Sequence, residues 1–504
     1  MANAEVLVVG AGPTGLVLAL WLARSGVPVR IIDKLAEPGT TSRALVVHAR
    51  TLELYRQLGL ADDVVSLGVQ FDAVNLWTYG RRVARAEFGA IGAGLTPFPH
   101  LIIFPQDQHE RLLIDHLKRA GVTVERPVEL LHLDDHGDGV RARIHHADAT
   151  VEESEFRFVA GCDGARSLVR EIVGAGFPGG TYDRMFYVAD MTLHGPVTDH
   201  ELHVALDDAD FLAVFPLKGD NTGRFIGTVR EDAERRHDQL TWADVSQRAV
   251  DRMHISVDRV NWFSTYHVHH RVARHFRSGR IFLLGDAAHI HSPVGGQGMN
   301  TGIGDAVNLA WKLAAVIRAA PPTLAARLLD SYEPERIEFA HRLVATTDRA
   351  FTFVTKDGPI ARFMRRRGLP AVLPLLLRLN AVRRFMFRTI SQTLIHYRHS
   401  ALSDGQAGSV HGGDRLPWIR PDDGAPSDNF TPLESLDWQV HVYGEPPADL
   451  QAWCSGAGLP VHAFPWREPM RHAGFVRNAA YLVRPDGYVA LAGADAANLA
   501  QYWR

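Results

Sequence analysis

The sequence predicts an α/β protein in which a parallel sheet with covering helices is interrupted by an antiparallel sheet and followed by a separate C-terminal domain. Three observations support this fold class. A short apolar run opens the chain and leads into a glycine-rich turn and a helix. Residues 176–275 contain short β-rich runs separated by Asp, Gly and Asn turns. Beyond about residue 400 the composition shifts to Gly, Pro and Asp before a compact αβ-like ending.

The composition is that of a globular protein, because 504 residues with 46% hydrophobic and 22% charged side chains can form several cores. A net charge of −3 supplies no basic field that would attract nucleic acid. Glu5 and the glycines interrupt the N-terminal apolar run, unlike a signal peptide, and no apolar stretch approaches the roughly 20 residues that span a bilayer. Cys162 and Cys454 are expected to be inert packing residues, so a cytoplasmic location is expected.

The first element is a strand, Val6–Val9, that leads directly into a glycine turn and a helix ending near Gly26. The turn reads Gly10-Ala11-Gly12-Pro13-Thr14-Gly15. A second strand, 29–32, ends at Asp33. In this pattern the first glycine makes the tight turn, the second lets backbone approach a pyrophosphate, and the third lets helix and strand pack closely. An acid at the end of the second strand can accept hydrogen bonds from a ribose diol. The sequence therefore predicts a Rossmann-like dinucleotide site.

Two further motifs follow buried strands. Gly161-Cys162-Asp163-Gly164-Ala165-Arg166-Ser167 places an acid beside cations. Later, 280–284 runs into Gly285-Asp286, where a carboxylate stands at the carboxyl end of a strand. The stretch Pro293-Val294-Gly295-Gly296-Gln297-Gly298-Met299-Asn300 then opens an amphipathic helix. Its backbone amides and the helix dipole favour negative charge, as on the edge of a reduced flavin.

With these three motifs in this order, residues 4–345 resemble the single-component FAD-dependent aromatic hydroxylases, and in particular the phenol and polyketide hydroxylases. The resemblance implies an FAD-binding domain in two parts, 1–175 and 276–400, with a substrate-binding domain of 176–275 inserted between them. Residues 74–100 are expected to add strands to that inserted domain. It also implies that Asp163 serves both FAD and a transient NADPH or NADH. The cofactor-binding residues that it implies are Gly10, Gly12, Pro13, Thr14, Gly15, Asp33, Lys34, Arg43, Gln106, Asp163, Asp286, Pro293, Gly298, Met299 and Asn300.

The antiparallel sheet is expected to lie over the flavin ring. Phe215 and Pro216 are candidates for the pocket wall beside the ring, together with Pro293. Tyr187 and His203 could accept a phenolic proton, although an interpretation as buried, hydrogen-bonded core residues fits them as well. No residue is assigned as a catalytic base, since the cofactor carries the chemistry. No Cys/His cluster predicts a metal site.

Two segments lie beyond the motifs. Residues 359–400 are Arg-rich and apolar, which allows docking on anionic membranes or packing as connecting helices. The second interpretation is preferred, because Pro370 and Pro374 are expected to break the helical face. Residues 401–504 end in Arg484-Pro485-Asp486-Gly487-Tyr488-Val489-Ala490, which is similar to the thioredoxin-like C-terminal domain of the phenol-hydroxylase branch. With Cys454 alone, that domain is expected to be structural, and a dimer contact is one such role.

The resemblance implies a monooxygenase. NADPH or NADH would reduce FAD, the reduced flavin would form a C4a-hydroperoxide with O2, and one oxygen atom would pass to a phenolic or polycyclic aromatic substrate. Baeyer–Villiger oxygenation of an aromatic polyketide by the same flavin peroxide is the alternative. The missing WxWxIP segment argues against a flavin-dependent halogenase. The pattern names neither the substrate nor the choice between NADH and NADPH.

Overall fold

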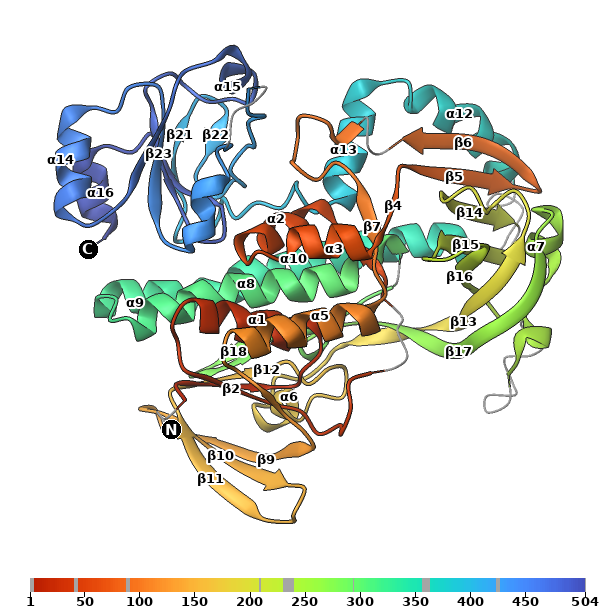
Figure 1. Cartoon of the computed structure of the whole chain (residues 1–504), viewed down its shortest axis with the longest axis horizontal. Helices are drawn as coiled ribbons and strands as arrows, with labels where there is room; N and C mark the ends of the chain where they lie inside the picture. The colour runs from red at the N-terminus through yellow and green to blue at the C-terminus, as the bar shows by residue number, and fades with distance from the viewer. Residues whose placement is uncertain are drawn as a thin grey trace.

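The computed structural model describes residues 4–39, 44–87, 91–207, 210–229, 240–292, 294–355, 363–422 and 427–503. Figure 1 shows three regions around the long central helix α8: a helix-covered parallel sheet, a second large sheet, and a C-terminal αβ unit. The mixed α/β architecture agrees with the predicted fold class. No helix of these ranges combines the length and the apolar character that a membrane span requires.

The first sheet is parallel apart from one edge strand, and its central strands are completely buried. Its order is β18 (Arg277–Ser278), β19 (Ile281–Leu283), β12 (Phe158–Gly161), β1 (Val6–Val9), β2 (Val29–Ile32) and β8 (Val124–Glu125). The predicted first two strands are confirmed with those bounds. Three motif strands, β1, β12 and β19, are therefore neighbours, so the turns that follow them meet at one edge of the sheet.

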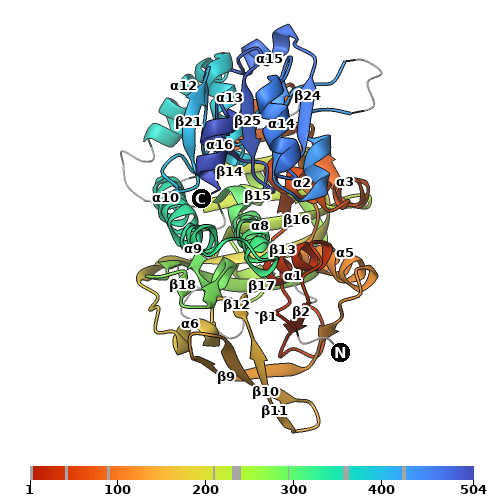
Figure 2. The ribbon, with the colours of Figure 1, turned by 90° about the vertical axis from the view of Figure 1, so that its left-hand side faces the viewer.

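Helices pack over this sheet because their apolar faces are buried against it. α1 (Pro13–Arg24) lies between α5 (Gln106–Arg119) and α8 (Gln297–Ile317), as Figure 2 shows from the side. The short helix α6 (Leu168–Ile172) follows β12. A separate three-stranded sheet of β9 (Val128–Asp135), β10 (Val140–His146) and β11 (Val151–Phe156) extends from the lower edge in both views.

The second large sheet contains eight strands, and it is antiparallel except where β14 pairs with β5. Its order is β20 (His289–Ile290), β17 (Ser256–Val272), β13 (Gly179–His194), β16 (Thr222–Thr228), β15 (Asp210–Pro216), β14 (Leu202–Asp207), β5 (Ala73–Thr78) and β6 (Arg81–Glu87). β5 and β6, from the region in which added strands are expected, form one edge of this sheet. One face packs with α7 (Arg248–Arg252) and the other faces the first domain.

Short elements connect the two sheets. β3 (Val46–Val47), β7 (Leu101–Ile103) and β4 (Val69–Phe71) form a small antiparallel sheet. α2 (Ala49–Gln57) follows β3, and α3 (Ala61–Leu67) follows α2. Ile103 of β7 and Phe186 of β13 share one hydrophobic core. The inserted sheet is thereby fixed against the dinucleotide-type domain.

The chain then continues through helices to the C-terminal unit. α9 (Pro322–Asp330) and α10 (Tyr332–Thr355) follow α8, and α12 (Leu369–Leu376) and α13 (Asn380–Ile390) come later. The expectation that Pro370 and Pro374 break the helix is wrong. Pro370 stands in the first turn of α12, where no backbone N–H is needed, and the helix continues through Pro374 at the cost of one hydrogen bond.

The C-terminal unit is a six-stranded mixed sheet with helices on its faces. The strands are β21 (Asp404–Ala407), β22 (Val410–His411), β23 (Gln439–Tyr443), β24 (Val461–Phe464), β25 (Ala480–Val483) and β26 (Val489–Ala492). The helices are α14 (Ala448–Gly456), α15 (Glu468–His472) and α16 (Ala496–Tyr502). Both cysteines of the chain are buried free thiols, and burial raises the pKa of each.

Candidate active site at the meeting of three turns

The glycine turn between β1 and α1 is shaped by its first and third glycines. Gly10 has φ of +101°, a left-handed conformation, and a Cβ there would collide with the carbonyl of Cys162. A Cβ at Gly15 would collide with the carbonyl of Gly10. At Gly12, by contrast, a Cβ would meet no protein atom within 4 Å. The space beside the second glycine is therefore open, as a site for a pyrophosphate requires.

Thr14 joins this turn to the other two motifs. A Cβ at Gly285, in the turn after β19, would lie 2.6 Å from the Thr14 Oγ1 atom. A Cβ at Gly302 of α8 would collide with the same oxygen. Pro13 stands at the first turn of α1, where its missing N–H costs nothing. The N-terminus of α1, the turn at Gly285 and helix α8 thus pack without room for a side chain between them.

Asp33 lies at the end of β2 and is part-buried. Its carboxylate accepts hydrogen bonds from the backbone N–H groups of Ala11 (2.7 Å) and Leu35 (2.8 Å). Arg126 approaches it to 3.3 Å and also donates to the Ala11 carbonyl at 3.3 Å. The predicted ribose ligand therefore also holds the glycine turn. Lys34 is exposed beside it.

Arg126 was not predicted, since it stands 93 positions beyond Asp33 and belongs to no motif. Its Nε atom is buried and has no hydrogen-bond partner among the described residues. Gln106 begins α5, where its side chain donates to Glu110 at 2.8 Å and its N–H donates to the Ala44 carbonyl at 3.1 Å. Burial raises the pKa of Glu110. The predicted Arg43 and Pro293 lie outside the described residues.

Asp163, in the motif after β12, is buried, and this burial raises its pKa. Its carboxylate accepts from the Ser167 hydroxyl at 2.5 Å and from the Val169 N–H at 3.1 Å, at the start of α6. Arg170 then bridges two motifs, donating to the carbonyls of Ala287 (3.0 Å) and Ala165 (2.9 Å). Asp163 and Arg170 thus hold the turns after β12 and β19 in place.

Asp286 and Asp305 have contrasting roles at the turn after β19. The side chain of Asp286 is exposed on a single 3-10 turn, Gly285–Ala287, although its strand is buried. Beneath it, the fully buried Asp305 of α8 accepts from the Gly285 N–H (3.0 Å) and pairs with His289 (2.7 Å) and Arg336 (2.5 Å). Asp305 therefore fixes the turn and leaves the Asp286 carboxylate facing outward.

The second glycine loop ends in two left-handed residues, Gly295 (φ +77°) and Gly296 (φ +63°), before α8 starts. The side chain of Asn300 holds this start in place. It donates to the carbonyls of Val46 (2.8 Å) and Gly296 (2.9 Å) and accepts from the His48 N–H at 2.9 Å. The first backbone N–H groups of a helix have no partner within the helix. Those of α8, which include the part-exposed predicted residues Gly298 and Met299, form a fixed set of donors.

Buried polar atoms without partners gather at the same loop. His48 Nδ1, His291 Nε2 and Ser292 Oγ are buried and make no hydrogen bond among the described residues. Burial lowers the pKa of His48 to about 4 and of His291 to about 4, so both rings are neutral at pH 7. An unsatisfied buried polar atom is costly unless a ligand pairs with it. Together with the open space at Gly12, these atoms fit a bound dinucleotide with a polar ring edge.

The predicted substrate residues divide between the two faces of the large sheet. Phe215 packs with Phe186 and Ile226 on the face toward the first domain. Tyr187 belongs to the core on the opposite face, because neighbouring residues of a strand point to opposite sides. His203 is fully buried, with its Nδ1 3.0 Å from the Trp77 indole nitrogen and its Nε2 2.7 Å from Asp199.

These positions do not bring Tyr187 and His203 together with the glycine loop. His203 is a hydrogen-bonded core residue, as in the alternative interpretation, and Tyr187 is buried in the core. Pro216 ends β15 opposite Gly223, at the rim of a small surface pocket shared with Phe215.

An open cavity of about 320 Å³ lies behind the glycine loop. Gly295 and Gln297 contribute to its floor, and α10 and the end of α13 form its walls. Most of its surface is apolar, with Phe339, Leu343 and Ile390 among the lining residues. This is the size of cavity that accommodates a small organic molecule.

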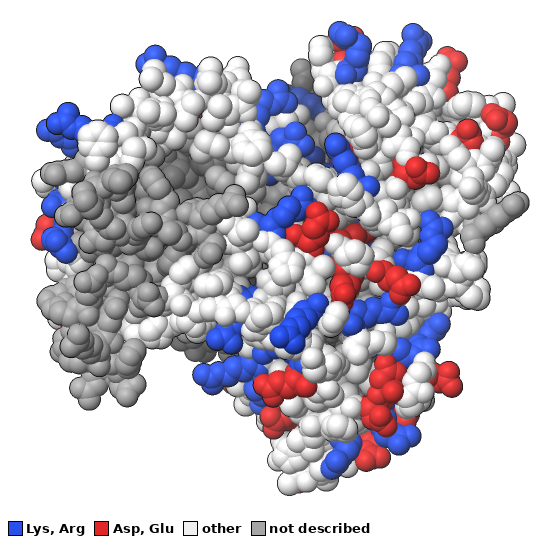
Figure 3. Space-filling model, turned by 180° about the vertical axis from the view of Figure 1, so that it is seen from behind, with Lys and Arg blue, Asp and Glu red and all other residues white. Residues whose placement is uncertain are grey.

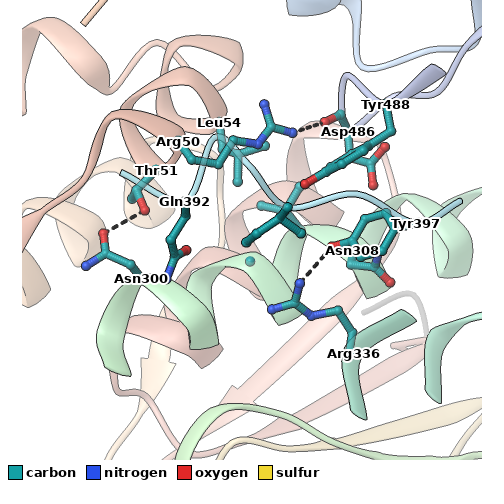
Figure 4. A pocket seen from close by; sticks show the side chains of 13 residues that line it. Arg50, Thr51, Leu54, Asn300, Asn308, Arg336, Gln392, Tyr397, Asp486 and Tyr488 are labelled. Carbon is teal, nitrogen blue, oxygen red and sulfur yellow. Dashed lines mark hydrogen bonds between the residues drawn. The ribbon is translucent and has the colours of Figure 1, made fainter. Parts of the chain in front are cut away.

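A polar cavity of about 20 Å³, room for a water molecule, shares the lining residues Gln392 and Ile395 with the larger cavity. Figure 4 shows three hydrogen bonds around the polar cavity. Thr51 donates to Asn300, Arg50 of α2 donates to the backbone carbonyl of Asp486, and Arg336 donates to the Tyr397 hydroxyl. The cavity therefore marks where α2, α8, α10 and the C-terminal unit meet.

Next to this polar cavity, Arg484 of the C-terminal unit is completely buried and forms a bidentate pair with Glu335 of α10 (2.8 and 3.0 Å). Lys312 of α8 joins the same carboxylate at 2.9 Å, and Asp486 pairs with Arg484 at 2.6 Å. The charges of the Arg-Pro-Asp-Gly turn are thus paired with those of the central helices. The cations hold the pKa of Glu335 well below its usual range.

Comparison with known proteins identifies the fold and its cofactor. Residues 3–347 match the family model described as FAD binding domain. The chain belongs to this family. FAD is the cofactor that this family binds. Within the described residues no group of three His, Cys, Asp or Glu side chains could hold a metal ion.

Relatives of this FAD-binding chain are monooxygenases. A 6-methylpretetramide 4-monooxygenase of Streptomyces rimosus is 36% identical over 418 residues, which cover 81% of this chain and 73% of the relative. Anhydrotetracycline hydroxylase OxyS of Streptomyces rimosus superimposes with a TM-score of 0.78 at 28% identity, covering 98% of this chain and 96% of that structure. Aklavinone-11 hydroxylase, solved with FAD and aklavinone, gives a TM-score of 0.78 at 26% identity and covers 100% and 99% of the two chains.

The protein is therefore an FAD-dependent monooxygenase with a reduced nicotinamide cosubstrate. The names of these relatives do not favour the Baeyer–Villiger alternative. The predicted resemblance to the FAD-dependent aromatic hydroxylases is confirmed.

Proposed function

We propose that this monooxygenase hydroxylates a polycyclic phenolic substrate. The observation that carries the proposal is the likeness along nearly the whole chain to hydroxylases that, by their names, act on anhydrotetracycline and aklavinone. The apolar cavity of about 320 Å³ against the glycine loop supports it, because an aromatic ring system needs such a surface beside the reacting centre.

FAD is proposed to lie along the edge where the three turns meet. Its pyrophosphate would occupy the open space at Gly12, at the N-terminus of α1, where free N–H groups and the helix dipole favour anions. Asp33 and the nearby Arg126 would contact the adenosine side. The exposed Asp286 would contact the ribityl–pyrophosphate junction. The other predicted ligands keep the roles that the resemblance implies.

The flavin ring is proposed to lie against the start of α8. When bound, FAD supplies the activation of O2 and the transfer of one oxygen atom to the aromatic ring. The protein contributes the N–H groups at the start of α8, which Asn300 holds in place and which stabilise negative charge. His48 and His291 offer neutral ring nitrogens, since a charged imidazolium is disfavoured at these buried positions.

The C-terminal unit is proposed to be a thioredoxin-like domain with a structural role, spanning 401–504. A dithiol redox reaction needs two nearby cysteines, and Cys454 is buried with a raised pKa. A homodimer contact through this unit and a cytoplasmic location for the enzyme belong to the same proposal, the latter because both thiols are free.

NAD(P)H oxidation tests the proposed function. Without an aromatic substrate, oxidation is expected to be slow, and a suitable polycyclic phenol should raise it at least tenfold, which corresponds to about 1.4 kcal/mol of barrier. The product should carry one additional oxygen atom by mass, on a ring carbon by NMR. Removing the phenolic hydroxyl should shift the products toward hydrogen peroxide. Equal oxidation rates with and without every phenol of a broad panel would contradict the proposal.

A further inference from the structure

The walls of the cavity behind the glycine loop form a slot between two elements. Phe339, Leu343 and Thr347 follow one another at intervals of four residues, so they line a single face of α10. Ile390, the last residue of α13, and Ile395 line the cavity from the other element. A slot with two largely apolar walls is suited to a flat ring system, because both faces of the ring would leave water.

The mouth of this slot carries positive charge. Arg342 and Arg388 stand at its rim, on α10 and α13, and His396 lines the same cavity. Arg342 is about half exposed and lies 3.8 Å from Glu338, a loose surface pair. Figure 3, which shows the molecule from behind, has Lys and Arg side chains gathered in the upper middle of the view.

The exposed side chain of Arg388 is the rim cation without a counter-ion, since it forms no hydrogen bond or ion pair with any part of the chain that the structure describes. Asp414 acts on it electrostatically, but that carboxylate is bound to Arg398 at 2.6 Å. Burial and the neighbouring Arg415 and Arg384 lower the pKa of Arg388. An arginine in this position gains free energy when an anion joins it.

We propose that the slot binds the aromatic substrate itself and that the substrate is an acidic one, whose anionic group pairs with Arg388. This inference rests on the proposed function, because it specifies the substrate class for the same hydroxylation. Gly295 and Gln297 form the floor of the slot, so a ring bound there lies against the loop that opens α8. Gln297 donates to the Ile390 carbonyl at 3.0 Å and thereby joins floor and wall.

Equilibrium dialysis of the FAD-loaded enzyme tests the proposal without turnover. The probes are 1-hydroxy-2-naphthoate, which is an anion at pH 7, and 1-naphthol, which has the same rings without the carboxylate. Arg388→Gln should raise the dissociation constant of the naphthoate about tenfold and that of naphthol less than about twofold. Arg141→Gln removes an exposed arginine on β10, away from the slot, and should change neither value.

A second variant tests the slot as the location. Thr346→Trp places a large side chain at an exposed position that lines the cavity, so folding should be retained while both probes bind at least tenfold more weakly. The inference would be overturned if Arg388→Gln weakened the binding of both probes equally, or if both slot variants bound the probes as tightly as the wild type. If the dialysis results are as expected but no phenol, acidic or neutral, stimulates NAD(P)H oxidation, the proposed function fails instead. If neutral phenols alone stimulate oxidation, that function stands and the acidic substrate class is wrong.

Discussion

At the scale of single residues, the site separates positions that serve the protein fold from positions that face a ligand. Gly15 and Gly10 are glycines because backbone carbonyls leave no room for a Cβ. Gly12 has no such reason within the protein, since its surroundings are open and its φ of −75° suits any residue. The sequence pattern predicted all three, because the turn is local and each role follows from spacing alone.

Gly12→Val should therefore abolish FAD retention while the apoprotein still folds, because the added side chain enters the pyrophosphate space and its Cβ meets no protein atom within 4 Å. Gly15→Val is the matched comparison, and it should destabilise the fold itself through its clash with the Gly10 carbonyl. FAD content after purification and thermal unfolding of the apoproteins measure the two effects. A Gly12→Val protein that purifies with stoichiometric FAD would remove the pyrophosphate from this turn.

Asp286, in the turn after β19, and Asp305, on α8, lead to a similar contrast. Asp286→Ala should weaken FAD binding by about 1–3 kcal/mol with little change in stability, since its carboxylate faces outward toward the proposed ribityl chain. Asp305→Ala should cost about 3–5 kcal/mol of folding free energy, because it leaves the buried Arg336 without its acid. Isothermal titration with FAD and urea unfolding distinguish them. An unchanged FAD affinity in Asp286→Ala would exclude that residue from the site.

At the scale of elements, prediction from the sequence succeeded where a local pattern determines the structure. It failed where the structure depends on contacts between distant parts of the chain. β1, α1 and β2 follow from a strand, a glycine turn and a periodic helix within 30 residues. For Tyr187 the sequence allows both a substrate role and a core position, and strand alternation puts Phe186, and not Tyr187, on the face toward the first domain. Arg126 could not be predicted, because its contact with Asp33 depends on how β8 docks beside β2.

The loop that opens α8 should make stability depend on pH. The pKa of His48 is lowered from 6.5 to about 4 in the folded state, so the unfolded chain binds the proton more readily between these values. The contribution of His48 to the free energy of unfolding is therefore fully present above pH 6.5. It declines as pH falls toward 4, by as much as about 3 kcal/mol. His48→Gln should flatten this decline in urea unfolding curves recorded at several pH values. His132→Gln, at an exposed position on β9, serves as the control and should leave the slope unchanged.

At the scale of the whole molecule, the C-terminal unit is joined to the flavin domain through charges that are completely buried. Arg50 of α2 and Arg484 of the Arg-Pro-Asp-Gly turn both bind Asp486, and Glu335 joins that turn to α10 and α8. α2 and α8 are also the helices whose first turns Asn300 connects at the glycine loop. The motif itself was visible in the sequence, but its partners were not, because they lie about 150 to 440 positions away.

Removing one partner of this network should affect both stability and cofactor binding. Arg484→Met leaves the buried Glu335 with Lys312 as its remaining cationic partner among the described residues, so the free energy of unfolding should fall by about 3–5 kcal/mol. FAD affinity should fall as well, since α8 loses a support at Lys312, about four turns beyond the loop that holds the flavin. Arg471→Met removes an exposed arginine paired with Glu468 in the same unit, and it should cost less than about 1 kcal/mol and leave FAD affinity unchanged. Denaturant unfolding and FAD titration of both variants provide the measurement.

If Arg484→Met unfolds at the denaturant concentration of the wild type, the buried pair does not hold the domains together. If it unfolds early but binds FAD normally, the C-terminal unit stabilises the chain without positioning the flavin loop.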